Sequence, residues 1–167
     1  MAEVLATGRY VRLVRDGTWE WAERVGATGA AVIAAATADG EVVLVEQHRV
    51  PVGARVIELP AGLVGDRGAE RNEEAAAREL EEETGFRAER IEQVAGGPIS
   101  AGMTSETLTL FRATGLVRVG PGGGDASEDI TVHLVPLDEA PAWLAAQAAA
   151  GVLVDPKVYA GLWFLKS

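Results

Sequence analysis

The strongest constraint on the fold lies in residues 75–86, AAARELEEETGF, where four glutamates occupy five positions. These glutamates are Glu79, Glu81, Glu82 and Glu83. On a helix, like charges three and four residues apart repel one another, at a cost of about 0.2–0.5 kcal/mol per pair. Such crowding is tolerated where water solvates the carboxylates or where a positively charged group binds to them.

The flanking residues carry the start and stop signals of a helix. Asn72 is the expected N-cap of a helix over residues 73–84, and Gly85 stands where a left-handed stop belongs. Two further helices are predicted near the C-terminus, one over residues 139–150 and one that is capped by Asp155 and begins at Pro156. Three aromatic residues of these two helices are interpreted as core: Trp143, Trp163 and Phe164.

The helical spacing brings three of the four glutamates to one face. Because a helix turns by about 100° per residue, Glu82 and Glu83 lie roughly 60° and 40° to either side of Glu79. Glu81 points to nearly the opposite side and is left for solvent. Converging carboxylates without a neighbouring histidine or thiol suit Mg²⁺ or Mn²⁺. A solvated acidic helix face is the alternative for three glutamates taken alone.

Composition narrows the class of protein. The 167 residues suit a single domain over 1–167, and 48% of them are apolar, enough for a core. A net charge of −10 argues against nucleic acid or an anionic membrane as a partner. With no cysteine and only two histidines, a thiolate or His-rich metal site is not expected. No apolar run reaches membrane-spanning length, and we expect a cytoplasmic protein.

The remaining segments predict strands grouped around the glutamate helix. YVRLVRD and WEWAERV flank Gly17 as an N-terminal hairpin, and several later segments are rich in β-branched and apolar residues. Blocks of strands around a central helix favour a mixed α/β sandwich over a parallel doubly wound sheet. The stretch GPGGGDASED, residues 120–129, is expected to be a mobile loop.

The glutamate helix and the loop before it together form a longer motif. It reads Gly62 … Glu70-x7-Arg78-Glu79-Leu80-x-Glu82-Glu83-x-Gly85-Phe86. This resembles the Nudix box, G-x5-E-x7-R-E-U-x-E-E-x-G-U, where U is a bulky apolar residue. The helical half matches at every specified position. Seven residues instead of five separate Gly62 from Glu70, so the loop is two residues longer.

The resemblance implies a fold, a chemistry and a set of roles. Nudix proteins are α/β/α sandwiches that use Mg²⁺ or Mn²⁺ to hydrolyse a nucleoside diphosphate linked to another group. By position, the metal ligands would be Glu79, Glu82 and Glu83, with the carbonyl of Ala61 as a possible addition. Arg78 would pair with Glu70 and so hold the loop to the helix.

Outside the box, residues 19–165 resemble the branch of Nudix enzymes that cleave ADP-ribose and nucleotide sugars. VEQHR and IELPAG are similar to two segments of that branch, which would make Arg49 a phosphate contact and Glu58 part of the site. Each is an ordinary surface residue when taken alone. SAGMTSE, residues 100–106, resembles a third segment, in which Gly102 and Glu106 would contact substrate. Ala101 replaces the proline that marks many ADP-ribose enzymes.

Two more features take their expected roles from this resemblance. In this branch the loop over 120–129 carries an extra catalytic carboxylate. Here this would be Glu128, with Asp125 and Asp129 as alternatives. A solvated acidic linker without a catalytic role is the other interpretation of this loop. The N-terminal strands, over about 1–26, would exchange across a homodimer, with residues 27–167 as the catalytic core. There the base would stack against Trp19, Trp21 and Arg24. Packing or an interface is the alternative role for the two tryptophans.

These interpretations predict a homodimeric, Mg²⁺-dependent Nudix pyrophosphatase acting on ADP-ribose or a related nucleotide sugar. A GDP-mannose-type substrate is the alternative within enzymes, and the Ala101 departure favours it. A catalytically silent Nudix module that senses a nucleotide is the alternative of another class. Such modules usually lose box glutamates, whereas this chain retains Glu79, Glu82 and Glu83.

Overall fold

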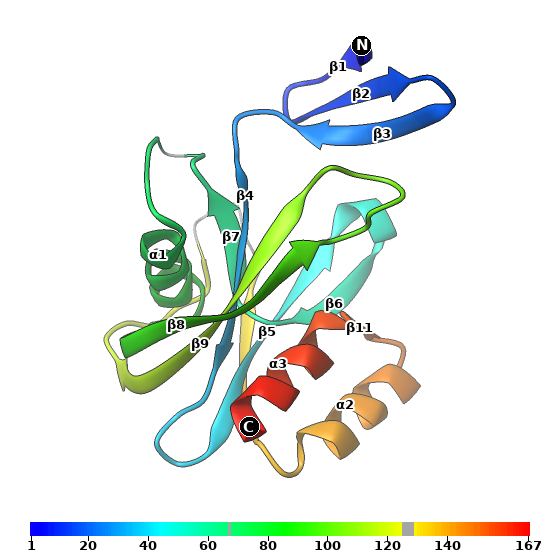
Figure 1. Ribbon diagram of the computed structural model, residues 1–167. Coiled ribbons are helices and arrows are strands. Elements are labelled where there is room, and N and C mark those ends of the chain that lie inside the picture. Colours follow the sequence, from blue (N-terminus) through cyan, green and yellow to red (C-terminus); the bar gives the residue numbers. More distant parts are fainter. Residues whose placement is uncertain (67, 125–128) are drawn as a thin grey trace.

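The computed structural model describes residues 1–66, 68–124 and 129–167, and Figure 1 shows their arrangement. Three sheets and three helices make up this part of the chain. The predicted mixed α/β architecture is confirmed. The predicted catalytic Glu128 and its alternative Asp125 lie outside the described residues.

The N-terminal sheet stands apart from the rest of the chain (Figure 1). Its three antiparallel strands are β1 (Glu3–Thr7), β2 (Val11–Asp16) and β3 (Trp19–Arg24). The predicted turn at Gly17 joins β2 to β3 with φ of 59°, a left-handed conformation that favours glycine. Strand β3 ties this sheet to the core: the N–H of Ala22 donates to the carbonyl of Met103 at 2.9 Å, the carbonyl of Ala22 accepts the N–H of Ser105 at 3.2 Å, and Arg24 pairs with Glu106.

Two four-stranded mixed sheets form the core of the fold. The first runs in the order β7 (Ala61–Val64), β4 (Gly29–Ala35), β9 (Thr107–Arg118), β8 (Phe86–Pro98). The second runs β10 (Thr131–Pro136), β5 (Glu41–Arg49), β6 (Ala54–Glu58), β11 (Leu153–Val154). The β4–β9 and β6–β11 pairs are parallel and the other pairs are antiparallel. A short 3₁₀ turn, Val50–Val52, joins β5 to β6.

The helices are α1 (Asn72–Thr84), α2 (Ala140–Ala149) and α3 (Lys157–Lys166). Strand β4 separates two hydrophobic cores, because alternate residues of a strand face opposite sides. Ala31 and Ile33 pack toward the core that contains α1, whereas Val32 and Ala34 pack toward the core that contains α2 and α3. Figure 1 shows α1 on one side of the sheets and α2 and α3 on the other.

The helix boundaries differ from the predicted ones by a residue or so. Helix α1 is capped by Arg71 rather than Asn72, because the side chain of Asn72 donates instead to Thr109 Oγ1 of β9 at 3.1 Å. The predicted stop at Gly85 is confirmed, with φ of 73°. Helix α3 begins at Lys157, one residue later than predicted. The carboxylate of Asp155 accepts the N–H of Lys157 at 2.8 Å and so acts as the predicted cap.

The prediction that Trp163 is a core residue is wrong. Its side chain is 63% exposed, because the buried face of α3 consists of Val158, Gly161 and Leu162. Trp163 packs edge-on against Phe164, which is partly buried against the core. No helix in the described parts of the chain is long and apolar enough to cross a membrane.

Candidate active site

A cavity of about 610 Å³ opens where α1 meets β7 and β4. Its floor comes from Ala30 and Val32 of β4 and from the start of β7. Five acidic and three basic side chains surround this floor. They are Glu58, Asp66, Glu79, Glu82, Glu83, Arg24, Arg49 and Lys157. The three glutamates predicted to share a helix face therefore line one cavity.

Gly62 of β7 allows Glu79 to reach this cavity. A Cβ atom at position 62 would lie 1.9 Å from Cδ and 2.1 Å from Oε1 of Glu79. Real Cβ atoms essentially never come closer than 3.0 Å to another heavy atom. Glycine therefore leaves room for the carboxylate in this position, and this contact is a steric reason for glycine at position 62 of the motif.

Glu83 is the most buried of the three carboxylates, with 3% of the residue exposed. Its Oε2 accepts the N–H of Ala61 at 3.1 Å, so the end of α1 is tied to the first residue of β7. A buried carboxylate needs such donors or a cation, because removal from water penalises the charge. Glu81 lies away from the cavity, as predicted, and pairs with Arg87 at 3.0 Å.

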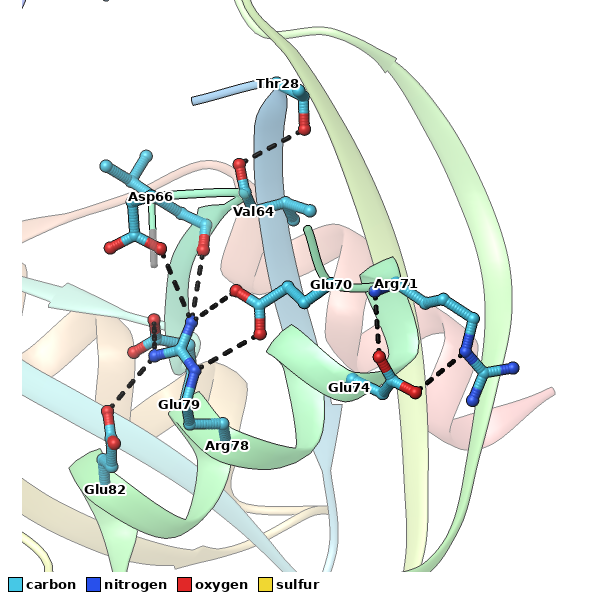
Figure 2. Close-up of polar contacts among 10 residues, drawn as sticks. Thr28, Val64, Asp66, Glu70, Arg71, Glu74, Arg78, Glu79 and Glu82 are labelled. Carbon is cyan, nitrogen blue, oxygen red and sulfur yellow. Dashed lines mark hydrogen bonds and ion pairs between the residues drawn. The ribbon is translucent and has the colours of Figure 1, made fainter. Parts of the chain in front are cut away.

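Arg78 is the centre of the ion-pair network behind the cavity (Figure 2). Its Nη2 lies 3.0 Å from Glu70 Oε1, and its Nη1 lies 2.7 Å from Glu79 and 3.3 Å from Glu82. Burial alone would lower the pKa of Arg78, but the hydrogen bonds to Glu70 and Glu79 outweigh it and raise the pKa. Arg78 therefore stays charged and binds the long loop to the helix, in spite of the two extra residues.

The carboxylates of the cavity are of a type that binds a hard divalent cation, and two of them pair with Arg78 in this structure. Among the residues that the structure describes, no group of three or more His, Cys, Asp or Glu side chains is already gathered for a metal ion. Glu79 and Glu82 both contact Arg78 Nη1. Both also line the cavity with Glu83 and Ala61, and together these residues offer an all-oxygen set of the kind that Mg²⁺ and Mn²⁺ prefer.

Each basic residue of the cavity is held by a carboxylate. Arg49 Nε donates to Glu58 Oε2 at 2.7 Å, Arg24 pairs with Glu106, and Lys157 pairs with Asp155. Such pairs fix the direction of a long cationic side chain before a ligand arrives. Two charged residues of the cavity lining, Lys157 and Asp66, were not predicted from the sequence. The position of Lys157, next to the cap of a helix, was its only available signal.

Four residues predicted to contact substrate lie outside the cavity lining: Trp19, Trp21, Gly102 and Glu106. Trp19 is 66% exposed, and Trp21 donates from its indole N–H to Glu23 at 2.9 Å within the N-terminal sheet. Gly102 lies in the turn between β8 and β9. The roles predicted for these four residues stay predictions. The base pocket expected at Trp19 and Trp21 needs a second copy of the chain.

The expected mobile loop is anchored in its first half. The N–H groups of Gly123 and Gly124 donate to the carbonyls of Glu83 and Glu82 at 2.7 and 3.0 Å, which satisfies backbone acceptors at the end of α1. Gly122 fits only as glycine, with φ of 70° and a built Cβ 2.4 Å from the carbonyl carbon of Thr84. The two hydrogen bonds to the end of α1 place Gly124 in the cavity wall.

Asp129, an alternative to Glu128, is directed elsewhere. Its carboxylate is 82% exposed and pairs with Arg55 at 2.8 Å. Arg55 also pairs with Glu46 of β5, and Glu46 contacts His133 at 2.8 Å. Asp129 therefore belongs to a network on the second sheet, and it does not line the cavity.

The fold and the cavity define an α/β protein with an acidic, cation-flanked site at the end of a helix. The model of the NUDIX domain matches residues 27–155, and the chain belongs to this family. The predicted family and hydrolase class are thereby confirmed. Nudix hydrolases use divalent metal ions and act on small nucleotide-derived substrates.

Two curated relatives and one solved structure support this assignment. The chain is 33% identical over 168 residues to an ADP-ribose pyrophosphatase of Mycobacterium tuberculosis, covering 96% of this chain and 79% of that protein. It is 34% identical over 148 residues to the methanol dehydrogenase activator of Bacillus methanolicus, covering 83% and 77% of the two chains. The fold is similar to that of an ADP compounds hydrolase, with a TM-score of 0.74, 19% identity, and coverage of 99% and 90%.

Proposed function

We propose that this chain hydrolyses the diphosphate bond of ADP-ribose or a related nucleoside diphosphate sugar with the help of Mg²⁺ or Mn²⁺. One observation carries the proposal: three box glutamates and three restrained cations line a single cavity. Similarity to an ADP-ribose pyrophosphatase over 96% of the chain supports the substrate class.

The ligands of the cation would be Glu79, Glu82 and Glu83, together with the carbonyl of Ala61. When bound, the cation supplies positive charge to the diphosphate and acidifies a water. Arg78 holds the helix and the loop in register, so that the three carboxylates keep their spacing. Gly62 and Gly85 provide the close approach and the helix stop that this geometry needs.

The other residues bind and orient the substrate. Arg49 and Lys157 offer charge-assisted hydrogen bonds to phosphate oxygens. Arg24, held by Glu106, stands on the side of the cavity nearest the N-terminal sheet, toward which the base would extend. In an exchanged homodimer the base would lie there between Trp19 and Trp21. Exposed apolar side chains on that sheet support an interface between two copies: Val4, Val11, Leu13 and Trp19.

The reaction adds water across the diphosphate bridge. The water oxygen bonds to one phosphorus, the bridging oxygen leaves with the other phosphate, and the proton passes to a carboxylate base. Glu128 is our candidate for this base. Support comes from Gly124, which lines the cavity and stands four positions before Glu128 in the chain. A nucleoside monophosphate and a sugar phosphate are the products.

A panel of nucleotide sugars, assayed with Mg²⁺ and with Mn²⁺, tests this proposal. Turnover of ADP-ribose supports it, whereas preference for GDP-mannose would assign the alternative substrate. Glu82→Gln should lose turnover by about 100-fold or more, since even outer partners of a metal site are worth about 10- to 100-fold. Glu81→Gln is the matched control on the opposite helix face. Retained nucleotide binding without turnover in the wild type would identify a sensor and contradict the proposal.

A further inference from the structure

A second groove, of about 240 Å³, lies beside the cavity. It runs between α3 and the β8–β9 edge of the first sheet. Its lining is mostly apolar and consists of Ala95, Gly96, Gly97, Pro98, Leu108, Leu110, Lys157, Ala160 and Phe164. Lys157 lines both the groove and the cavity. The two spaces therefore meet at this side chain.

Strand register shows that the cavity and the groove share one floor. Two rows of paired residues cross β7, β4, β9 and β8 in turn. The rows are Leu63, Ala30, Leu108, Gly97 and Ala61, Val32, Leu110, Ala95. In each row the first two residues line the cavity and the last two line the groove. With neighbouring strands about 4.8 Å apart, the floor extends for roughly 14 Å.

The glutamates mark the end of this floor at which the diphosphate would bind. Glu79 approaches Gly62, and Glu83 contacts Ala61, both on β7. The groove begins two strands away, at a distance of roughly 10 Å. A ring carried on a ribose 5-phosphate can span that distance. Between the glutamates and the groove the bound substrate would contact Lys157, whose positive charge can bind a phosphate oxygen.

The chemistry of the groove favours a flat ring over a bare sugar. Lys157 is the one charged side chain of its described lining, and the hydroxyls of a sugar would lose water there without gaining partners. A heteroaromatic ring instead gains from contact with Pro98, Leu108 and the ring of Phe164. Gly97 keeps the slot open, because a Cβ atom built there meets no atom within 4 Å.

We propose that this groove binds a heteroaromatic ring on the second ribose of the substrate, so that dinucleoside diphosphates are better substrates than ADP-ribose. This inference rests on the proposed function, since it requires a diphosphate held at the glutamates. The products of diadenosine diphosphate are two molecules of AMP, whereas ADP-ribose gives AMP and ribose 5-phosphate. The two substrates differ only in the second ring.

The test is the ratio of kcat/KM for diadenosine diphosphate to kcat/KM for ADP-ribose. Stacking of one base is worth about 1–3 kcal/mol, so the wild-type ratio should be roughly 5 to 150. Gly97→Leu fills the groove from β8, and Ala160→Leu fills it from α3. Each variant should bring the ratio near one. Gln93→Leu adds the same side chain to β8 outside the groove and should keep the wild-type ratio.

The outcomes separate this inference from the proposed function. Hydrolysis of ADP-ribose with a wild-type ratio near or below one would overturn the groove as a ring site. A high ratio that neither Gly97→Leu nor Ala160→Leu lowers would overturn it as well. Absence of hydrolysis of both compounds and of every nucleotide sugar would instead reject the proposed function. Thermal denaturation of each variant shows whether it is folded.

Discussion

Replacing Gly62 with alanine tests how closely the cavity depends on the position of one carboxylate. The new Cβ would stand 1.9 Å from Glu79 Cδ, so the carboxylate must move by at least about 1.5 Å to restore an ordinary contact of 3.4 Å. Misplacement of a catalytic group by about 1 Å can cost about 100-fold in rate. We therefore expect Gly62→Ala to lower kcat for ADP-ribose by about 100-fold.

Stability should change little in the same variant. The atoms that must move belong to the far end of a flexible side chain, and Gly62 is not in a left-handed conformation. Alanine in a strand is more stabilising than glycine by about 0.5–1 kcal/mol, and this gain in folding stability offsets part of the loss of the Arg78–Glu79 contact. The free energy of unfolding should therefore stay within about 1 kcal/mol of the wild type.

The assay is steady-state hydrolysis of ADP-ribose with Mg²⁺, combined with urea denaturation. Gly120→Ala serves as the control, because position 120 has open space around a Cβ atom and no positive φ. It should keep wild-type turnover. Gly62→Ala with turnover within a few-fold of the wild type would refute the steric argument, and so would a loss of turnover that only reflects unfolding.

Two further predictions concern stability. Gly122→Ala would force a left-handed alanine against the backbone of Thr84, which should destabilise the fold by about 2 kcal/mol or more. The expected decrease in Tm is roughly 4–8 °C. An unchanged Tm would contradict the proposed anchoring of the loop. Burial raises the pKa of Glu46, but hydrogen bonds from Arg55 and His133 outweigh it and hold the pKa below its ordinary value of 4.5. A carboxylate with a lowered folded-state pKa stabilises the fold above pH 4.5, and this contribution is lost as pH falls through the lower value. Glu46→Gln should therefore be less stable than the wild type at pH 7, and the difference in Tm should shrink below pH 4.5; a difference that does not vary with pH would contradict this account.

The sequence could predict the parts of the site that depend on local geometry. The positions of Glu79, Glu82 and Glu83 on one face follow from helical spacing alone, as does the outward direction of Glu81. The stop at Gly85 likewise follows from a glycine at the end of a periodic segment. These features involve residues a few positions apart, for which the backbone geometry of one element is sufficient.

Features that depend on tertiary contacts could not be predicted in this way. Lys157 reaches the cavity because α3 packs across the sheet, 74 positions after Glu83 in the chain. Asn72 looked like a cap, but β9 supplies a partner for its side chain. The anchoring of Gly123 likewise depends on the carbonyl groups that the end of α1 leaves without helical partners.

The resemblance to the Nudix box supplied what local geometry could not. It related Gly62 and Glu70 to the helix that follows them, and it predicted the pairing of Glu70 with Arg78. The structure adds the physical cause: Gly62 leaves space for Glu79, and Arg78 joins the loop to α1 at 3.0 Å.

Calorimetric titration with Mn²⁺ tests most directly whether Glu79, Glu82 and Glu83 hold a divalent cation. With a slowly hydrolysed ADP-ribose analogue present, the wild type and Glu81→Gln should bind Mn²⁺ with similar affinity. Glu82→Gln and Glu83→Gln should each bind it about 10-fold or more weakly. Equal affinity in all four proteins, or no binding by the wild type, would contradict the assignment of the cation to this helix face.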